Sequence, residues 1–188
     1  QIARTPGRSE KQWLAFENVL AEEGLNLYIY TCVTKLNAAG IGALFEKIRM
    51  RSDALSKPSP PVICAFLKPI GDGLTHRGTL LQSFAERTST ARNILQEAQS
   101  NGINVGFRNL QACLAPELVP YLVDYYIEDA SVNLRTGESE GYAHGSYWRR
   151  VDACEECGHN EVCPGVYFDD PLKEANTLFK SLKREGLG

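Results

Sequence analysis

Three cysteines lie close together in the segment CEECGHNEVC, which spans residues 154–163. Their spacing is C-x2-C-x5-C. The short step from Cys154 to Cys157 allows both sulfurs to face one metal centre, and a second turn at Gly158 brings Cys163 toward the same centre. Clustered thiolates of this kind suit zinc or an iron–sulfur cluster, and they do not suit magnesium or calcium.

A structural metal centre uses four protein ligands, and we predict that Cys113 is the fourth. Cys32 and Cys64 lie in apolar, strand-like runs, where a thiol behaves as a small buried hydrophobic group. His159 falls between two predicted ligands, and we interpret it as a solvated loop residue. Disulfides or buried free thiols are the alternative interpretation of the six cysteines.

The composition is that of an ordinary globular protein: 188 residues, 43% hydrophobic and 23% charged. This length allows one domain, or one domain with a small appendage. A net charge of -3 gives no electrostatic argument for nucleic acid, and no apolar run approaches the roughly 18 residues of a membrane span. A chain of this size does not need stapling by disulfides, so we expect a reducing compartment, the cytoplasm.

Helical and strand patterns alternate along the first part of the chain. The pattern predicts, in order, a helix over 9–23, a strand over 25–33, a helix capped by Asn37 and running through Ile48, a strand over 62–67, a helix over 79–100 and a strand over 103–107. In the first helix, we expect Trp13, Leu14, Phe16, Val19 and Leu20 to form the apolar stripe. The alternation is typical of βαβ units and a parallel sheet.

The pattern changes after Cys113. A short helix over 116–126 begins with a proline in its first turn. We expect a hairpin that turns about residues 136–137 and pairs 131–135 with the residues around Tyr147. The cysteine segment follows, and a last helix opens at Asp170-Pro171.

Several short motifs together resemble a known family. They are RTPG at 4–7, YTCVTKLN at 30–37, FLKPIG at 66–71, and NLQACL at 109–114 followed by C-x2-C-x5-C-x-G. In this order they resemble the second half of a radical S-adenosylmethionine (radical SAM) barrel. The cysteine-bearing part is similar to the auxiliary-cluster appendages called twitch and SPASM domains.

The resemblance implies an α/β fold with two parts. Residues 1–110 would form the later βα units of a partial TIM-like barrel, and residues 111–188 a small α+β auxiliary-cluster domain. The implied ligands of one auxiliary 4Fe–4S cluster are Cys113, Cys154, Cys157 and Cys163.

The resemblance also implies a place for S-adenosylmethionine. Arg4 would meet its methionyl carboxylate, and Thr34 and Asn37 would approach its ribose. In the alternative interpretation, Asn37 caps a helix and Arg4 forms a surface ion pair. A complete enzyme of this family uses a 5′-deoxyadenosyl radical to modify a substrate, and relatives with such appendages often modify a peptide or protein.

The sequence departs from the family pattern in three places. It lacks the C-x3-C-x2-C motif of the catalytic cluster and the Gly-Gly-Glu-Pro segment that meets the methionyl amine. Tyr167 stands where the larger SPASM pattern has a further cysteine, which favours one auxiliary cluster. We therefore expect a preceding half barrel or a partner subunit to supply the catalytic motif. The alternative function is a non-catalytic zinc- or cluster-binding subunit that complements another chain's half barrel.

Overall fold

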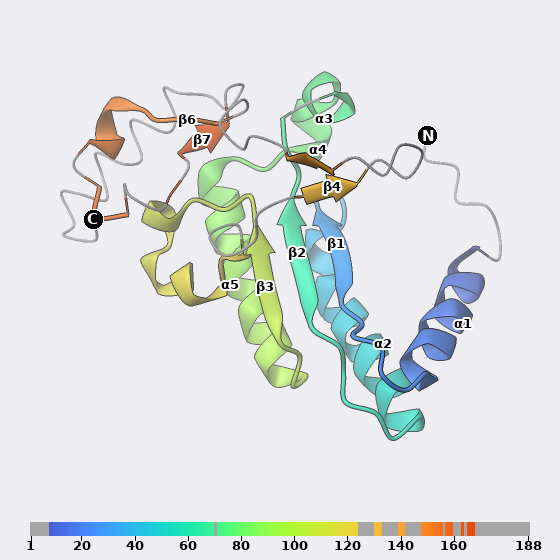
Figure 1. Ribbon diagram of the computed structural model, residues 1–188. Coiled ribbons are helices and arrows are strands. Elements are labelled where there is room, and N and C mark those ends of the chain that lie inside the picture. The colour runs from blue at the N-terminus through green and yellow to red at the C-terminus, as the bar shows by residue number, and fades with distance from the viewer. Residues whose placement is uncertain are drawn as a thin grey trace.

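The structure is a computed structural model that describes residues 8–69, 71–123, 130–132, 139–141, 148–155, 157–159, 163 and 165–167 (Figure 1). Its helices are α1 (Arg8–Ala21), α2 (Ile41–Ala54), α3 (Asp72–Thr75), α4 (Arg77–Leu80) and α5 (Phe84–Ser100). Its strands are β1 (Ile29–Val33), β2 (Val62–Phe66), β3 (Val105–Arg108), β4 (Ala130–Val132), β5 (Ser139–Gly141), β6 (Trp148–Arg149) and β7 (Val166–Tyr167). Short 3-10 helices are η1 (Ala38–Gly40), η2 (Ala112–Leu114), η3 (Pro116–Tyr121) and η6 (Asp152–Cys154).

A three-stranded parallel sheet in the order β1-β2-β3 forms the frame of the molecule. The connection from β1 to β2 contains α2, the connection from β2 to β3 contains α5, and both helices cover the same face of the sheet (Figure 1). The predicted βαβ alternation is therefore confirmed. The barrel and the division at residue 110 stay predictions.

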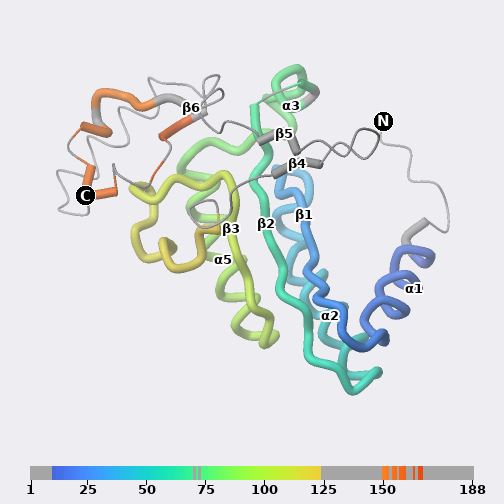
Figure 2. The backbone as a smooth tube through the Cα atoms, in the orientation of Figure 1, coloured from blue at the N-terminus to red at the C-terminus, as the bar shows by residue number. Residues whose placement is uncertain are grey.

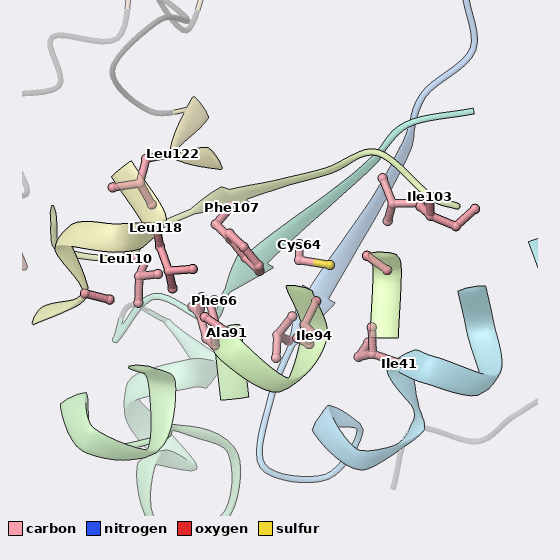
Figure 3. Close-up of a cluster of buried hydrophobic side chains, with 14 of the residues drawn as sticks. Ile41, Cys64, Phe66, Ala91, Ile94, Ile103, Phe107, Leu110, Leu118 and Leu122 are labelled. Atoms are coloured by element: carbon pink, nitrogen blue, oxygen red, sulfur yellow. The ribbon is translucent and has the colours of Figure 1, made fainter. Parts of the chain in front are cut away.

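The main core lies between the sheet and its two helices (Figure 3). Phe45 and Ile48 of α2 and Ile94 of α5 are fully buried there, against Phe66 and Phe107, whose ring centroids lie 6.4 Å apart. These residues recur at helical spacing in the sequence and at alternate positions in the strands, so the observed core is the one that the periodicity predicts.

The two cysteines of the strands have different environments. Cys64 is fully buried in the core, and burial raises the pKa of its thiol to about 12. Cys32 is exposed, as is Tyr30 on the same face of β1, so the prediction of a buried thiol is wrong there. The physical reason is the alternation of side chains along a strand, since the helices cover only the opposite face.

The first helix packs against α2 (Figure 2). The Trp13 ring meets Phe16 edge to face with centroids 5.5 Å apart, and Lys47 Nζ lies 4.6 Å from the Trp13 centroid. Arg51 forms an ion pair with Glu17. The apolar stripe predicted for this helix is wider than the observed contact, because Leu14 and Val19 are exposed.

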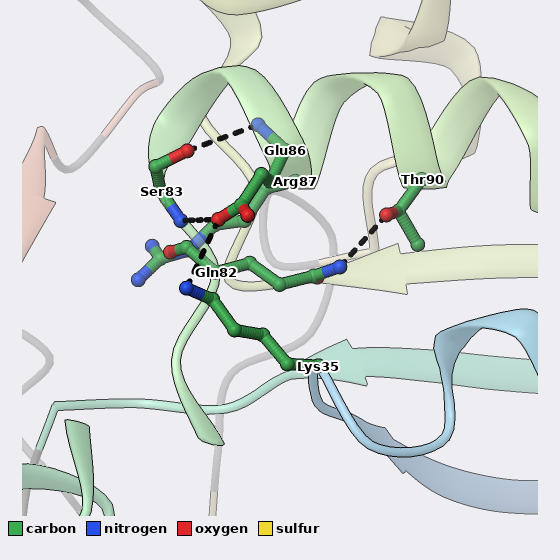
Figure 4. Close-up of polar contacts among 6 residues, drawn as sticks. All are labelled: Lys35, Gln82, Ser83, Glu86, Arg87 and Thr90. Atoms are coloured by element: carbon green, nitrogen blue, oxygen red, sulfur yellow. Dashed lines mark hydrogen bonds and ion pairs between the residues drawn. The ribbon is translucent and has the colours of Figure 1, made fainter. Parts of the chain in front are cut away.

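The helix predicted over 79–100 is two helices. The chain leaves helical geometry after α4, and Ser83 then caps α5 (Figure 4). Ser83 Oγ accepts a hydrogen bond from the Glu86 amide at 3.2 Å, while the Ser83 amide donates to Glu86 Oε2 at 2.7 Å. This reciprocal pair is a capping box. It satisfies the backbone amides of Ser83 and Glu86, which have no partner inside the helix because α5 begins here.

The strand pairing after residue 129 differs from the expected hairpin. β4 pairs antiparallel with β5, and β6 pairs antiparallel with β7 instead of with β4. The expected turn at residues 136–137 lies outside the described residues. The tertiary pairing thus joins Trp148–Arg149 to the segment after the last cysteine. The predicted helix over 116–126 is the shorter η3, which has the expected proline at its start. The predicted helix that opens at Asp170 lies outside the described residues.

A membrane-crossing helix is not found in the described ranges, where every helix is too short or too polar for that purpose.

We predict that Ser83→Ala destabilises the protein by about 1 kcal/mol, because it removes the side-chain acceptor of the capping box. Chemical denaturation of the variant and the wild type measures this loss. Ser89→Ala is the matched control, because Ser89 is exposed in the middle of α5, where alanine favours the helix. Equal stability of the Ser83 variant and the wild type would contradict the role of the cap.

Candidate metal centre

The chain turns sharply where β3 ends. Asn109 has φ 62°, in the left-handed region that asparagine tolerates better than most residues. Its buried side-chain amide donates a hydrogen bond to the backbone oxygen of Phe66, the last residue of β2, at 2.7 Å. This bond fixes the direction in which the chain leaves the carboxyl edge of the sheet.

The turn leads into η2, which contains the predicted fourth ligand. The Leu114 amide donates to the Gln111 carbonyl at 3.2 Å, so the backbone around Cys113 is closed into one tight turn. Ala112 and Leu114 are buried on either side, while Cys113 itself is half-buried. Burial of these neighbours holds the Cys113 thiol in place without a long element.

The first two cysteines of the loop are positioned by consecutive turns. The Cys154 amide donates to the Val151 carbonyl at 2.8 Å, and the Cys157 amide donates to the Cys154 carbonyl at 3.2 Å. The Val151 amide also donates to Cys154 Sγ at 3.4 Å. The turn expected at Gly158 is present, and after it the Cys163 amide donates to the carbonyl of His159 at 2.8 Å.

A two-stranded pairing closes the loop behind the cysteines. Trp148 pairs with Tyr167, and Arg149 pairs with Val166. Gly165, between Cys163 and β7, has φ 100°, a conformation that an L side chain rarely adopts. The strand pair therefore brings both ends of the cysteine loop together.

A small apolar cluster joins this loop to the rest of the protein. Phe84 of α5 and Leu114 of η2 pack with Val151 and Val166 from the loop, and all four are buried. Cys113 and Cys154 pack against the same cluster. The loop consequently lies beside the carboxyl end of β3 (Figure 1).

All four predicted ligands line one cavity of about 10 Å³, together with Gln111, Gly165 and Val166. This volume is about the room that one water molecule needs. The cysteines are free thiols, so the disulfide interpretation is wrong for them. His159 is not among the described residues that line the cavity.

The pKa values of two thiols show how closely the sulfurs are gathered. Burial raises the pKa of the Cys113 thiol, and the neighbouring Cys163, Cys157 and Cys154 raise it further. Burial is also the main cause that raises the pKa of the Cys154 thiol, against the lowering effect of the Val151 amide. Without a cation these two thiols hold their protons, and a bound metal would displace them.

The thiols surround the cavity but are not yet arranged around an ion. Among the described residues, no group of three or more His, Cys, Asp or Glu side chains could hold a metal ion as it stands. A zinc ion needs each sulfur at about 2.3 Å, so the sulfurs would have to close in around it. A 4Fe–4S cluster is larger than the cavity and would require them to move outward. The donor chemistry fits both groups, because four of the side chains that line the cavity in the described part of the chain are thiols.

Gln111 is the residue of this site that the sequence did not single out. The residue is 1% exposed, and neither its Nε2 nor its Oε1 atom has a hydrogen-bond partner within the described part of the chain. A buried amide left in this way costs about 1–3 kcal/mol. The only signal in the sequence is one polar residue between Leu110 and Ala112, which by itself does not indicate burial.

Thr34 and Asn37 are brought together at the carboxyl end of β1, although not at the thiol cavity. Asn37 Oδ1 accepts from the Thr34 amide at 2.8 Å and from Thr34 Oγ1 at 3.1 Å, and Asn37 Nδ2 donates to the Cys32 carbonyl at 2.7 Å. The prediction that Asn37 caps the second helix is wrong, because its side chain makes no capping bond and binds backward into the turn. Arg4 lies outside the described residues.

Comparisons of this chain with protein-family models, with curated proteins and with solved structures found no match.

We predict that Asn109→Ala is more destabilising than Asn109→Gly. Both variants lose the hydrogen bond to Phe66, which contributes about 1 kcal/mol to stability. Alanine is destabilised by about a further 1–2 kcal/mol, because its side chain disfavours the left-handed backbone conformation at this position. Chemical denaturation of the two variants measures the difference. A glycine variant that is no more stable than the alanine variant would show that φ at residue 109 does not constrain the turn.

Proposed function

We propose that this chain is the cluster-bearing part of a radical SAM enzyme and that Cys113, Cys154, Cys157 and Cys163 hold one auxiliary 4Fe–4S cluster. The observation that supports the proposal best is the convergence of these four free thiols, from two distant parts of the chain, on a single cavity. The other two cysteines, Cys32 and Cys64, do not line this cavity.

The surroundings of the cavity also support a metal centre. The apolar cluster around Phe84 and Val166 limits water access on one side, and the Val151 amide already donates to one sulfur. Limited solvent access and N–H donors to sulfur are the features by which proteins tune such centres. When bound, the cluster would supply an electron-transfer centre that also braces the loop.

The parallel sheet is consistent with a partial barrel. In barrel enzymes the ligand sites gather at the carboxyl ends of the strands, and the Thr34–Asn37 turn and the turn at Asn109 both lie at such ends. We propose that the Thr34–Asn37 turn borders the S-adenosylmethionine pocket of the complete enzyme. Asn37 uses Oδ1 and one Nδ2 hydrogen in bonds within the turn, so its side chain would hold the backbone that borders this pocket.

We further propose that the complete enzyme takes a hydrogen atom from a peptide or protein substrate in the cytoplasm. The catalytic cluster and the earlier strands would come from a preceding half barrel or from a partner subunit. The outer edge of β1 has no strand paired to it in the described ranges, and an open edge of a parallel sheet favours pairing with further strands.

One observation favours a second candidate, a zinc-binding subunit without catalytic activity. The cavity of about 10 Å³ is closer in size to a single ion than to a cluster of four irons. Four thiolates also suit tetrahedral zinc. In that case the metal would only join the loop to the sheet.

We predict that anaerobic treatment of the metal-free chain with ferrous iron and sulfide yields a stable cluster, measured by visible absorbance and by iron and sulfide analysis. Cys113→Ala and Cys157→Ala should lose most of the bound iron, because each removes one of four ligands. Cys32→Ala is the matched control, since Cys32 is exposed and does not line the cavity.

Tight binding of Zn²⁺ without assembly of a cluster would favour the zinc-binding subunit. Unchanged metal content in both ligand variants would contradict the four-cysteine site for either metal.

Radical SAM catalysis can be tested separately from metal binding. We predict that the coding region before residue 1, or a gene for a partner subunit, encodes C-x3-C-x2-C. Co-expression with that segment should then allow reductive cleavage of S-adenosylmethionine, measured as release of 5′-deoxyadenosine. No such motif in either place would rule out the radical SAM assignment while leaving the metal centre intact.

A further inference from the structure

Gln111 is the one side chain at the cavity whose presence the four-ligand site does not explain. It is almost completely buried, it lines the same cavity as the four thiols, and its carboxamide has no hydrogen-bond partner among the residues that the structure describes. Buried polar groups are hydrogen-bonded in the great majority of cases, so this exception requires a physical reason.

The chemistry of the lining limits what can satisfy the carboxamide. Apart from Gln111, the side chains at the cavity are four cysteines and Val166, and Gly165 adds only backbone. Among the described residues, sulfur is therefore the only side-chain acceptor that faces the cavity besides Gln111 itself. A neutral thiol accepts hydrogen bonds weakly, whereas a metal-bound thiolate is negatively charged and accepts them strongly. A bound metal would therefore supply the hydrogen-bond partner that Gln111 lacks among the described residues.

An N–H···S hydrogen bond is already present at this site. The Val151 amide donates to Cys154 Sγ at 3.4 Å from the loop side of the cavity. Gln111 belongs to the other chain segment, the one that follows β3. A second donor from this segment would place N–H groups on sulfur from both parts of the chain.

The backbone of Gln111 is held in place without a metal. Its backbone carbonyl accepts from the Leu114 amide at 3.2 Å, in the same turn that holds Cys113. The Asn109 side chain anchors the preceding residues to the end of β2. A donor held by the frame loses little freedom when it bonds to sulfur, which makes the bond more effective.

We propose that Gln111 is a positioning residue of the metal centre, and that its carboxamide N–H donates a hydrogen bond to the sulfur of a metal-bound cysteine. The inference rests on the proposed metal centre and adds a role that the ligand set does not imply. The bond would strengthen metal retention and, for an iron–sulfur cluster, raise the reduction potential, because it stabilises the more negative form.

The test compares Gln111→Leu with the wild type in the full 188-residue chain, in two states. In the metal-free state we expect the variant to be as stable as the wild type or more stable in chemical denaturation, since leucine removes an unsatisfied polar group. After loading with ferrous iron and sulfide, or in a separate arm with Zn²⁺, we expect retention against a chelator to fall about 10-fold or more. The reduction potential of the cluster should fall as well.

Two further variants sharpen the test. Gln111→Glu keeps the size of the side chain but replaces the donor with a carboxylate, so retention should fall further than in the leucine variant. Gln82→Leu is the matched control. Gln82 is partly buried, its Nε2 donates to Thr90 Oγ1 at 2.8 Å, and it does not line the thiol cavity, so its loss should leave metal retention unchanged.

The outcomes separate this inference from the proposed function. Unchanged retention and potential in Gln111→Leu, with a wild type that binds metal, would overturn the role of Gln111 alone. Equal destabilisation of the metal-free and the loaded variant would also overturn it, because a packing role would explain both. A wild-type chain that retains neither iron nor zinc would overturn the metal centre and, with it, this inference.

Discussion

The apolar contact of Phe84 and Leu114 with Val151 and Val166 is the interaction on which the candidate metal centre depends. In its described part, the cysteine loop contains the 3-10 helix η6, turns at Cys157 and Gly158, and the two-residue strand β7. Elements this short are not stable alone, since packing supplies most of the stability of local structure. Because α5 packs on the sheet and η2 follows directly after β3, this contact holds the loop against the most extensively packed part of the protein.

The carboxyl edge of the sheet fixes the chain segments that lead to the candidate sites. Asparagine side chains satisfy backbone carbonyls at the ends of two adjacent strands: Asn37 donates to Cys32 in β1, and Asn109 donates to Phe66 in β2. At both places the chain leaves the sheet by a tight turn, and a side-chain amide donates to a backbone carbonyl at the end of a strand. The two candidate sites, the Thr34–Asn37 turn and the thiol cavity, are therefore built on one edge by the same device.

Two features of the metal-free centre are energetically unfavourable. The pKa of the Cys113 thiol is raised by burial and by its three neighbours, and the Gln111 carboxamide has no partner in the described part of the chain. A cation would relieve both conditions, because it converts thiols to thiolates and gives the amide an acceptor. Since thiolates form only by loss of protons, metal uptake should release protons and weaken as the pH falls. Folding of the loop and binding of a metal would then be one coupled process.

Much of this protein was determined by the sequence itself. The spacing of apolar residues gave the βαβ order and the core, and the C-x2-C-x5-C run with Cys113 identified the residues that line the cavity. These features are local or periodic, so they can be read along the chain. The tertiary structure alone decided that β6 pairs with β7, that Cys32 is exposed while Cys64 is buried, and that Gln111 faces the thiols. Each of these depends on which distant segment covers a residue, and no local pattern contains that information.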